Sequence, residues 1–562
     1  MSKICNMLIL AVPLILFTGL TISAQEVKRA EKVSEADLTR VFVKEKSDPV
    51  IHPRVRDSVK GKPSDEKVAV WIFFTDKGIF SKDAYQVACS EAEQTLSERA
   101  KWRRAKVNRK VDFTDLPVRM EYRETAISLG ATHRATTKWF NGVSVEVPVG
   151  RLQEIANLPF VREIQLVNRS KREPIRFKKG HDKMPSTERS YQLDYGPSLG
   201  QLEQINVPAV HELGYTGQGV LVCMLDTGYN LDHEALQHLD LIAEYDFINK
   251  DGNTANEPGD PPGQHDHGTA TLSAVGGAKH GQLYGPAFGA SFILAKTEDL
   301  PSETPVEEDF WMAAIEWADS IGADVASSSL IYLDWYTYED MDGNTATITK
   351  AADMAAARGI LVCNAAGNER DDDWYYIAAP ADADSILACG AIDGNGIIAF
   401  FSSSGPSYDG RIKPEVVARG LSTRVAQSTH PHGYYNGLGT SFATPLVAGA
   451  AALILEAHPD WTPMQVREAL MMTADRAENP DNLYGWGIID VLAAINYEPS
   501  QIKGDVNGDG NVNVLDALMA ANIIIGLIQP TPNQIVAADC NEDGSINVMD
   551  VICILLIIIG DG

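Results

Sequence analysis

The chain has 562 residues, of which 44% are apolar and 22% charged, and its formal net charge is −28. This is the composition of a folded globular protein, so it excludes a largely disordered chain and a protein with several membrane spans. The length exceeds what one hydrophobic core can organise and predicts several folded units, at about 150 residues each.

Charge is divided unevenly along the chain. Residues 25–190 hold 34 Lys and Arg against 24 Asp and Glu, whereas residues 191–562 hold 13 against 52. A basic front segment attracts the acidic remainder, which suits a leader that docks on the domain it precedes. Because the acidic part repels phosphate groups, we expect no binding to nucleic acid. We also expect the protein to be a monomer.

The first 24 residues have the pattern of a cleavable export signal. Lys3 precedes an apolar run from Met7 to Leu20, and small residues ending at Ala24 come before a charged stretch. A membrane anchor is the alternative, but the run is shorter than the roughly 20 residues of a spanning helix. We therefore expect a secreted protein without a membrane span in the mature chain, either free or attached to a cell surface.

Residues 25–66 are predicted to be a poorly ordered lead-in, because they are charged, contain three prolines and show no sustained apolar period. Residues 67–167 are predicted to form a small α+β domain. Its signs are a strand at 67–75, two charged helical stretches, and a strand–helix–strand pattern from Phe140. Residues 168–196 are basic, lack an apolar period and form an exposed linker, where proteases cut.

From residue 197 to residue 497, apolar runs alternate with amphipathic helices. Continuous apolar strands that alternate with helices predict an α/β fold with a doubly wound parallel sheet, whose sites lie beyond the carboxyl ends of the strands. Seven cysteines are too few for a disulfide framework. Three of them, Cys223, Cys363 and Cys389, lie in apolar runs and are expected to be buried rather than bridged or reactive.

Two polar residues are candidates for a functional site at the carboxyl ends of the predicted strands. Asp226 ends the run GVLVCMLD, although an Asp after a strand is commonly only a helix cap. His267 opens a helix of small residues. We favour it over the neighbouring His265 and Asp266 because Gly268 directly follows it.

Ser441 lies between a glycine-containing turn and a long apolar helix. A serine in this position is normally a helix cap. Its hydroxyl would also be exposed near the positive end of the helix, which favours a nucleophile whose reaction develops an oxyanion.

These three segments, together with LVCNAAGN ending at Asn368, resemble the subtilisin family of serine peptidases in the family's chain order Asp, His, Ser. The resemblance covers residues 197–497 and implies a subtilisin-like fold. It implies that Ser441 attacks the peptide carbonyl, that His267 moves the proton and that Asp226 stabilises the imidazolium. It also implies that Asn368 donates to the oxyanion and that the chemistry needs no cofactor. The family's SLGG segment reads SLIY here from Ser329, so no side-chain preference transfers.

Residues 67–167 resemble the inhibitory propeptide of the same family, most clearly in FNGVSVEVPVGRLQEIANLPFVREI. The resemblance implies a zymogen whose propeptide assists folding, blocks the cleft and is removed by self-cleavage. An unrelated α+β domain is the alternative. We expect the cut to fall between Asn168 and Gly200.

Two acidic loops of 12 residues, beginning at Asp505 and Asp539, repeat near the C-terminus. Both have oxygen-bearing side chains at the positions that a calcium ion requires and a glycine at the turn. Solvated acidic turns are the alternative. With the apolar helices that follow, residues 498–562 resemble a dockerin, an all-α module that folds with Ca²⁺ and binds a cohesin-like partner. The ligands implied are Asp505, Asn507, Asp509, Asn511, Asn513 and Asp516 in the first loop and Asp539, Asn541, Asp543, Ser545, Asn547 and Asp550 in the second.

The sequence therefore predicts a secreted serine endopeptidase that acts on protein or peptide substrates. Two other functions remain open at this stage. One is a catalytically dead binding protein, against which the complete triad argues. The other is a maturation protease restricted to one partner, which would differ in substrate range more than in mechanism.

Overall fold

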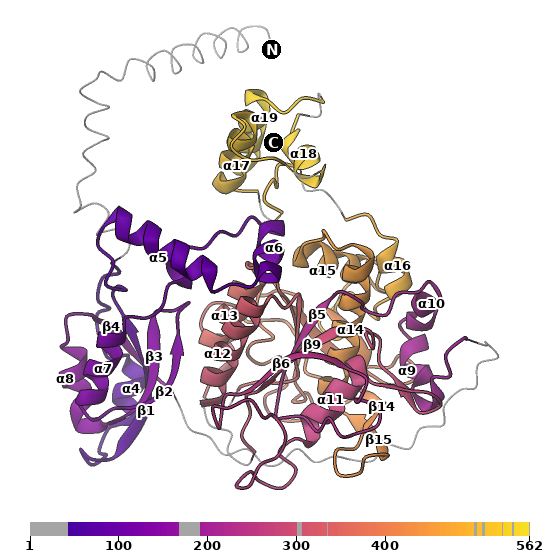
Figure 1. The fold of residues 1–562 in the computed structure, drawn as a ribbon, viewed down its shortest axis with the longest axis horizontal. Coiled ribbons are helices and arrows are strands. Elements are labelled where there is room, and N and C mark those ends of the chain that lie inside the picture. Colours follow the sequence, from indigo (N-terminus) through magenta and orange to yellow (C-terminus); the bar gives the residue numbers. More distant parts are fainter. Residues whose placement is uncertain are drawn as a thin grey trace. The chain divides into compact units, whose positions relative to one another are not determined.

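The computed structural model describes residues 43–167, 191–300, 306–333, 335–499, 503–508, 512–530, 532–541 and 544–560 (Figure 1). The expected export signal and residues 168–190 of the linker lie outside them. The chain divides into two compact units. The first comprises residues up to Ala92 with 111–133 and 140–166, and the second comprises 93–110, 134–139 and the chain from Val167 onward.

The first unit is built on a four-stranded sheet in the order β2-β3-β1-β4. Strand β1 pairs antiparallel with both β3 and β4 and is buried along its length after its first residue. Its apolar side chains share one core with those of α7 and α8, which confirms the predicted α+β arrangement. The bounds in this part of the chain are β1 (Lys67–Phe74), α5 (Lys82–Gln94), α7 (Met120–Ser128), β2 (Thr132–Thr137), β3 (Gly142–Pro148), α8 (Leu152–Ala156) and β4 (Val161–Leu166).

Residues 43–66 correct the expectation of a poorly ordered lead-in. Helix α4 (Pro53–Ser58) forms there, and Val55 is fully buried in the core of the first unit. Ile51 forms a β-bridge with Ile164 of β4. Two isolated apolar residues show no period in the sequence, so the segment is ordered by contact with a strand far along the chain.

The second unit contains a seven-stranded sheet in the order β13-β12-β11-β10-β5-β9-β6. Its strand pairs are parallel, and the central strands are buried throughout, as predicted for a sheet covered on both faces. The strands are β5 (Leu221–Asp226), β6 (Asp240–Asp246), β9 (Ser291–Lys296), β10 (Val325–Ser328), β11 (Leu361–Ala365), β12 (Leu387–Ile392) and β13 (Val416–Arg419). The helices discussed below are α6 (Glu98–Lys106), α11 (Asp266–Gly276), α12 (Val306–Ile321), α13 (Thr347–Ala356) and α14 (Thr440–Ala457).

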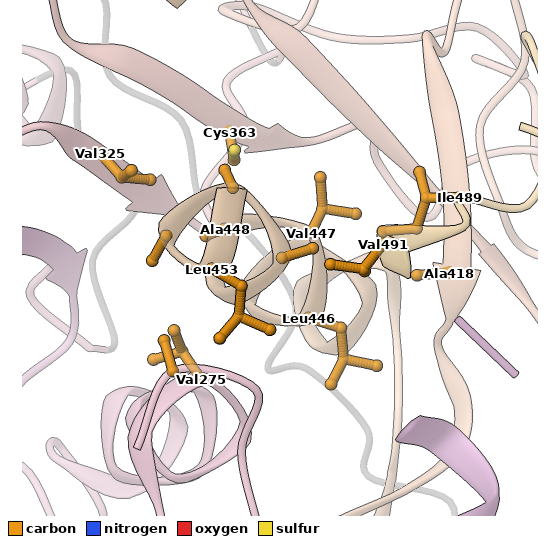
Figure 2. Packing of buried hydrophobic residues seen from close by; sticks show 14 of the residues in the cluster. Val275, Val325, Cys363, Ala418, Leu446, Val447, Ala448, Leu453, Ile489 and Val491 are labelled. Carbon is orange, nitrogen blue, oxygen red and sulfur yellow. The ribbon is translucent and has the colours of Figure 1, made fainter. Parts of the chain in front are cut away.

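Helix α14 lies at the centre of this unit's core. It is buried from Thr440 to Leu455, and its apolar side chains contact strands of the sheet on one side and α11 on the other (Figure 2). A helix that is apolar on all sides is stable only when buried in this way. Among the described residues, α14 is also the one helix long and apolar enough to cross a membrane, and 89% of it is buried inside the protein.

The three cysteines of the apolar strands are fully buried, as predicted. Burial raises the pKa of each thiol, so Cys223, Cys363 and Cys389 behave as small hydrophobic residues.

Within the described part of the C-terminal segment there are three helices, α17 (Val514–Ile524), α18 (Pro532–Ala538) and α19 (Val548–Ile558). Helices α17 and α19 pack against each other around a small core that includes Ala520 and Ile554. A disulfide joins Cys540 to Cys553, a pairing that the sequence analysis did not identify. The all-α prediction for this segment is confirmed.

Candidate active site

The predicted site residues lie at the carboxyl edge of the parallel sheet or on helices that begin there. Asp226 is the last residue of β5, and Asn368 follows β11. His267 and Ser441 are each the second residue of a helix, α11 and α14 respectively. Parallel strands end at one edge, so residues far apart in the sequence meet there.

Asp226 and His267 form a buried hydrogen-bonded pair. Asp226 Oδ1 lies 2.7 Å from His267 Nδ1, and Asp226 is 0% exposed. The backbone N–H of Thr227 donates to the same oxygen at 2.7 Å, and Thr271 Oγ1 donates to Oδ2 at 2.8 Å. A carboxylate accepts only, so the arrangement places the imidazole proton on Nδ1 and leaves Nε2 as an acceptor.

The neighbours of His267 are engaged elsewhere. His265 exchanges hydrogen bonds with Asn256, and Asp266 accepts one from Ser428 Oγ. The glycine after His267 is required by close packing, because a Cβ on Gly268 would lie 2.2 Å from the carbonyl oxygen of Gly228. The preference for His267 thus has a steric reason that involves the turn after Asp226.

Ser441 shares a pocket with His267 and Asn368. Its hydroxyl donates to the carbonyl of Ser329 at 3.3 Å, and Ser329 Oγ donates back to the Ser441 carbonyl at 2.9 Å. Ser441 lies in the first turn of α14, where backbone N–H groups have no intrahelical partner. A ligand in the pocket can therefore meet the hydroxyl, the imidazole and a free N–H together.

Asn368 presents its amide nitrogen as the available donor. Its Oδ1 accepts hydrogen bonds from Thr440 N at 2.8 Å and Thr440 Oγ1 at 3.0 Å, so the side chain is fixed in one orientation. Thr440 precedes the serine, so the same contact ties Asn368 to the start of α14. A fixed N–H donor beside a nucleophile is suited to stabilising a developing negative charge.

The pocket is also lined by acidic residues that the sequence analysis did not select. Glu298, Asp299 and Glu307 come from the acidic stretch that follows β9. Tyr332 belongs to the SLIY segment, from which no substrate side-chain preference could be inferred. Its hydroxyl donates to Glu298 Oε1 at 2.5 Å. The high density of carboxylates in residues 298–309 is the sequence feature that could have identified these pocket residues.

The C-terminal loops have oxygen ligands of the kind that calcium binds. Asp516 and Asp550, at position 12 of each loop, are fully buried and accept backbone N–H groups from their own loops. Both carboxylates therefore point into the turn that the other ligands surround, with the oxygen chemistry that Ca²⁺ requires. Of the implied ligands, Asp509, Asn511 and Asp543 lie outside the described residues, and the others occupy the two loops beside Asp516 and Asp550.

A further group of carboxylates, Asp246, Asp251 and Glu257, is close enough to hold one cation. Lys296 already forms ion pairs of 2.7 Å with Asp246 and with Asp260. Part of the negative charge is thus balanced by the protein itself, and we assign no metal there.

Comparison with known proteins gives three family matches. The model of the subtilase family matches residues 217–487, that of the peptidase S8 propeptide domain, Bacteroidota, matches 69–182, and that of the dockerin type I domain matches 503–554. The three resemblances drawn from the sequence are thereby confirmed.

Curated relatives match over 297 residues, or 52% of this chain. Subtilisin E of Bacillus subtilis (strain 168) is 37% identical, with 70% of its length covered. Subtilisin of Bacillus pumilus is 36% identical and Subtilisin Savinase of Lederbergia lenta 33% identical, each with 97% of its length covered.

Proposed function

This chain belongs to the subtilase family of serine-type endopeptidases, and on that premise we propose that it cleaves peptide bonds with Ser441, His267 and Asp226. It is made as a secreted zymogen that processes itself and is attached to a partner through its dockerin domain. The observation that carries the proposal is the 2.7 Å contact between His267 and the buried Asp226, in a structure where His267 and Ser441 line one pocket.

In the proposed reaction, Ser441 Oγ attacks the carbonyl carbon of the scissile peptide while its proton moves to His267 Nε2. The hydroxyl must first turn away from the Ser329 carbonyl, and catalytic hydrogen bonds commonly tighten only when substrate is bound. Asp226 stabilises the imidazolium that results. His267 then gives the proton to the leaving amine, and water repeats the sequence to release the acid and regenerate Ser441.

The tetrahedral intermediate places a negative oxygen near the start of α14. Asn368 Nδ2 and the backbone N–H of Ser441 are its proposed donors, and the positive end of the helix dipole adds to their effect. The position of Asn368 does not depend on substrate, because Thr440 holds its carbonyl oxygen. Such preorganised donors need no reorientation when the charge develops.

Replacing Asn368 with leucine is expected to lower kcat by about 10²–10³ with little change in KM, the loss known for the corresponding asparagine of subtilisin. Leucine keeps the volume but supplies no donor. Steady-state hydrolysis of a peptide substrate measures the effect, with Asn395→Leu, on an exposed turn, as the control. An unchanged kcat would remove Asn368 from the oxyanion site.

The proposal is tested by labelling the processed protein with a fluorophosphonate, which reacts with activated serines. We expect one labelled peptide, modified at Ser441, and loss of casein hydrolysis in step with labelling. Absence of label would indicate a catalytically dead binding protein. Normal labelling without casein hydrolysis would instead favour a maturation protease restricted to one partner.

Exposed apolar residues on the C-terminal module support attachment to a partner. The first-repeat residues Val514, Leu515 and Ile525 are exposed, and so are the residues at the same positions of the second repeat, Val548, Met549 and Ile559. A duplicated apolar surface next to the calcium loops suits a protein partner, which we propose is cohesin-like. Bound to such a partner on a cell surface, the secreted enzyme would act on proteins outside the cell.

A further inference from the structure

Helix α6 precedes the expected cleavage region in the sequence, yet its residues belong to the second unit, which contains the peptidase sheet. Two of its side chains have almost no contact with solvent: Arg103 is 0% and Arg104 is 2% exposed. A buried guanidinium needs acceptors for its N–H donors, so the surroundings of these arginines define what the helix recognises.

Asp319, in the last turn of α12, is the charged partner of both arginines. Arg103 Nη2 and Arg104 Nη2 donate to different oxygens of its carboxylate, and Arg104 Nε donates to Oδ1 at 3.0 Å. Burial by itself would raise the pKa of Asp319, but the guanidinium groups of Arg103, Arg104 and Arg358 hold it below its ordinary value. The carboxylate therefore remains charged while α6 is in place.

Hydrogen-bond donors of α6 and of Ser97, the residue before it, also contact backbone carbonyl groups at the C-terminal end of α12. The last four carbonyls of a helix have no intrahelical partner and form its negative pole. Residues of the propeptide region supply donors to three of them and to the next two carbonyls after the helix. The contacts are Arg103 Nη2 to the Asp319 carbonyl (3.1 Å), Ser97 N to Ser320 (3.0 Å), Ser97 Oγ to Ile321 (2.5 Å), Arg99 Nε to Gly322 (3.1 Å) and Arg103 Nη1 to Ala323 (2.6 Å).

The residue after α12 is shaped for the backbone of α6. A Cβ on Gly322 would lie 2.6 Å from the backbone nitrogen of Ala100, which is itself fully buried. Any other residue at this position would force the helix away. The end of α12 thus offers charge, hydrogen-bond acceptors and a fitted surface to one helix of the propeptide.

We propose that α6 is an anchor that keeps the cleaved propeptide bound to the peptidase, with Asp319 and the carbonyls at the end of α12 as its receptor. This rests on the proposed function, in which a cut after residue 167 makes the propeptide a separate chain. The opposite charges of residues 25–190 and 191–562 favour the association. Arg358 Nε lies 3.9 Å from Asp319 Oδ2 and remains as a counter-ion when α6 dissociates. The carboxylate of Asp319 is therefore not left as an unpaired buried charge.

The test uses the full-length precursor carrying Ser441→Ala, which is cut in its basic linker by added trypsin and checked by mass. The dissociation constant of the two fragments is then measured after gel filtration in calcium-containing buffer. We expect the parent fragments to co-elute. Arg103→Ala with Arg104→Ala is expected to raise the dissociation constant about 100-fold, because the two guanidinium groups that α6 donates to the buried carboxylate are lost.

The matched control is Lys101→Ala with Arg123→Ala. It removes the same charge from half-buried side chains that pair with Glu98 and Glu124, and it is expected to change binding less than about threefold. Retention of the double-arginine variant at the parent's affinity would overturn the proposal. If that variant does not fold, Asp319→Asn carries the same test from the receptor side, with an expected loss of at least about tenfold. Because trypsin makes the cut, the result does not depend on self-cleavage, so failure of the zymogen proposal would be seen separately.

Discussion

Replacing Ser441 with alanine is expected to leave the precursor whole under conditions in which the parent chain shortens. Purified precursors are incubated with calcium, and their masses are followed over time. The parent should yield a product whose first residue lies between Asn168 and Gly200. The variant has no hydroxyl at the position that shares a pocket with His267, so it has no acyl acceptor. For subtilisin the corresponding loss of the nucleophile costs about 2 × 10⁶ in kcat, which is complete on the time scale of processing.

Ser329→Ala is the matched control for this experiment. Its hydroxyl lines the same pocket and donates to the Ser441 carbonyl at 2.9 Å, so its removal alters the neighbourhood of the nucleophile but not the triad. We expect processing to slow by less than about tenfold, the range for loss of one neutral hydrogen bond. Processing of Ser441→Ala at the parent's rate would show that another protease makes the cut. If the parent also stays whole, fluorophosphonate labelling distinguishes an inactive site from maturation by a second enzyme.

The parts of the fold that could be predicted are those recorded in short stretches of sequence. The buried strands β5, β9, β11 and β12 each contain an apolar run, and the short strand β10 consists of small residues. Strands β6 and β13, at the two edges of the sheet, are harder to recognise in the sequence. Three of the seven residues of β6 are acidic, and β13 has three apolar residues followed by Arg419, so neither shows a strong apolar run.

The candidate site residues could be proposed from the sequence for a different reason. Asp226, His267, Asn368 and Ser441 each lie in a motif of small residues that shapes the local turn, and the family resemblance supplied their roles. The sequence could not predict that Arg103 and Arg104 enter the peptidase unit, because a charged amphipathic helix normally exposes its arginines. Their burial depends on Asp319, more than 200 positions away, and no local pattern records such a pairing.

Removing calcium is expected to unfold the C-terminal module. Each loop gathers several carboxylates, and Asp516 and Asp550 are fully buried, so without a cation these charges repel one another at close range. The core available to oppose this is small: it consists mainly of alanine and a few branched residues around Ile554. The disulfide between Cys540 and Cys553 restrains one loop and the following helix but supplies no positive charge.

The measurement is circular dichroism of residues 500–562, titrated with a chelator and then with calcium. We expect the helical signal to fall by more than about half and to return with calcium. Asp505→Asn with Asp539→Asn should raise the calcium concentration needed by at least about tenfold, because each loop loses the carboxylate at its first position. Glu542→Gln removes one charge at a loop position with no implied ligand role and should leave the midpoint within about twofold. A module whose helices ignore the chelator would have to be stabilised by its apolar core and disulfide alone, and the acidic loops would then be solvated turns.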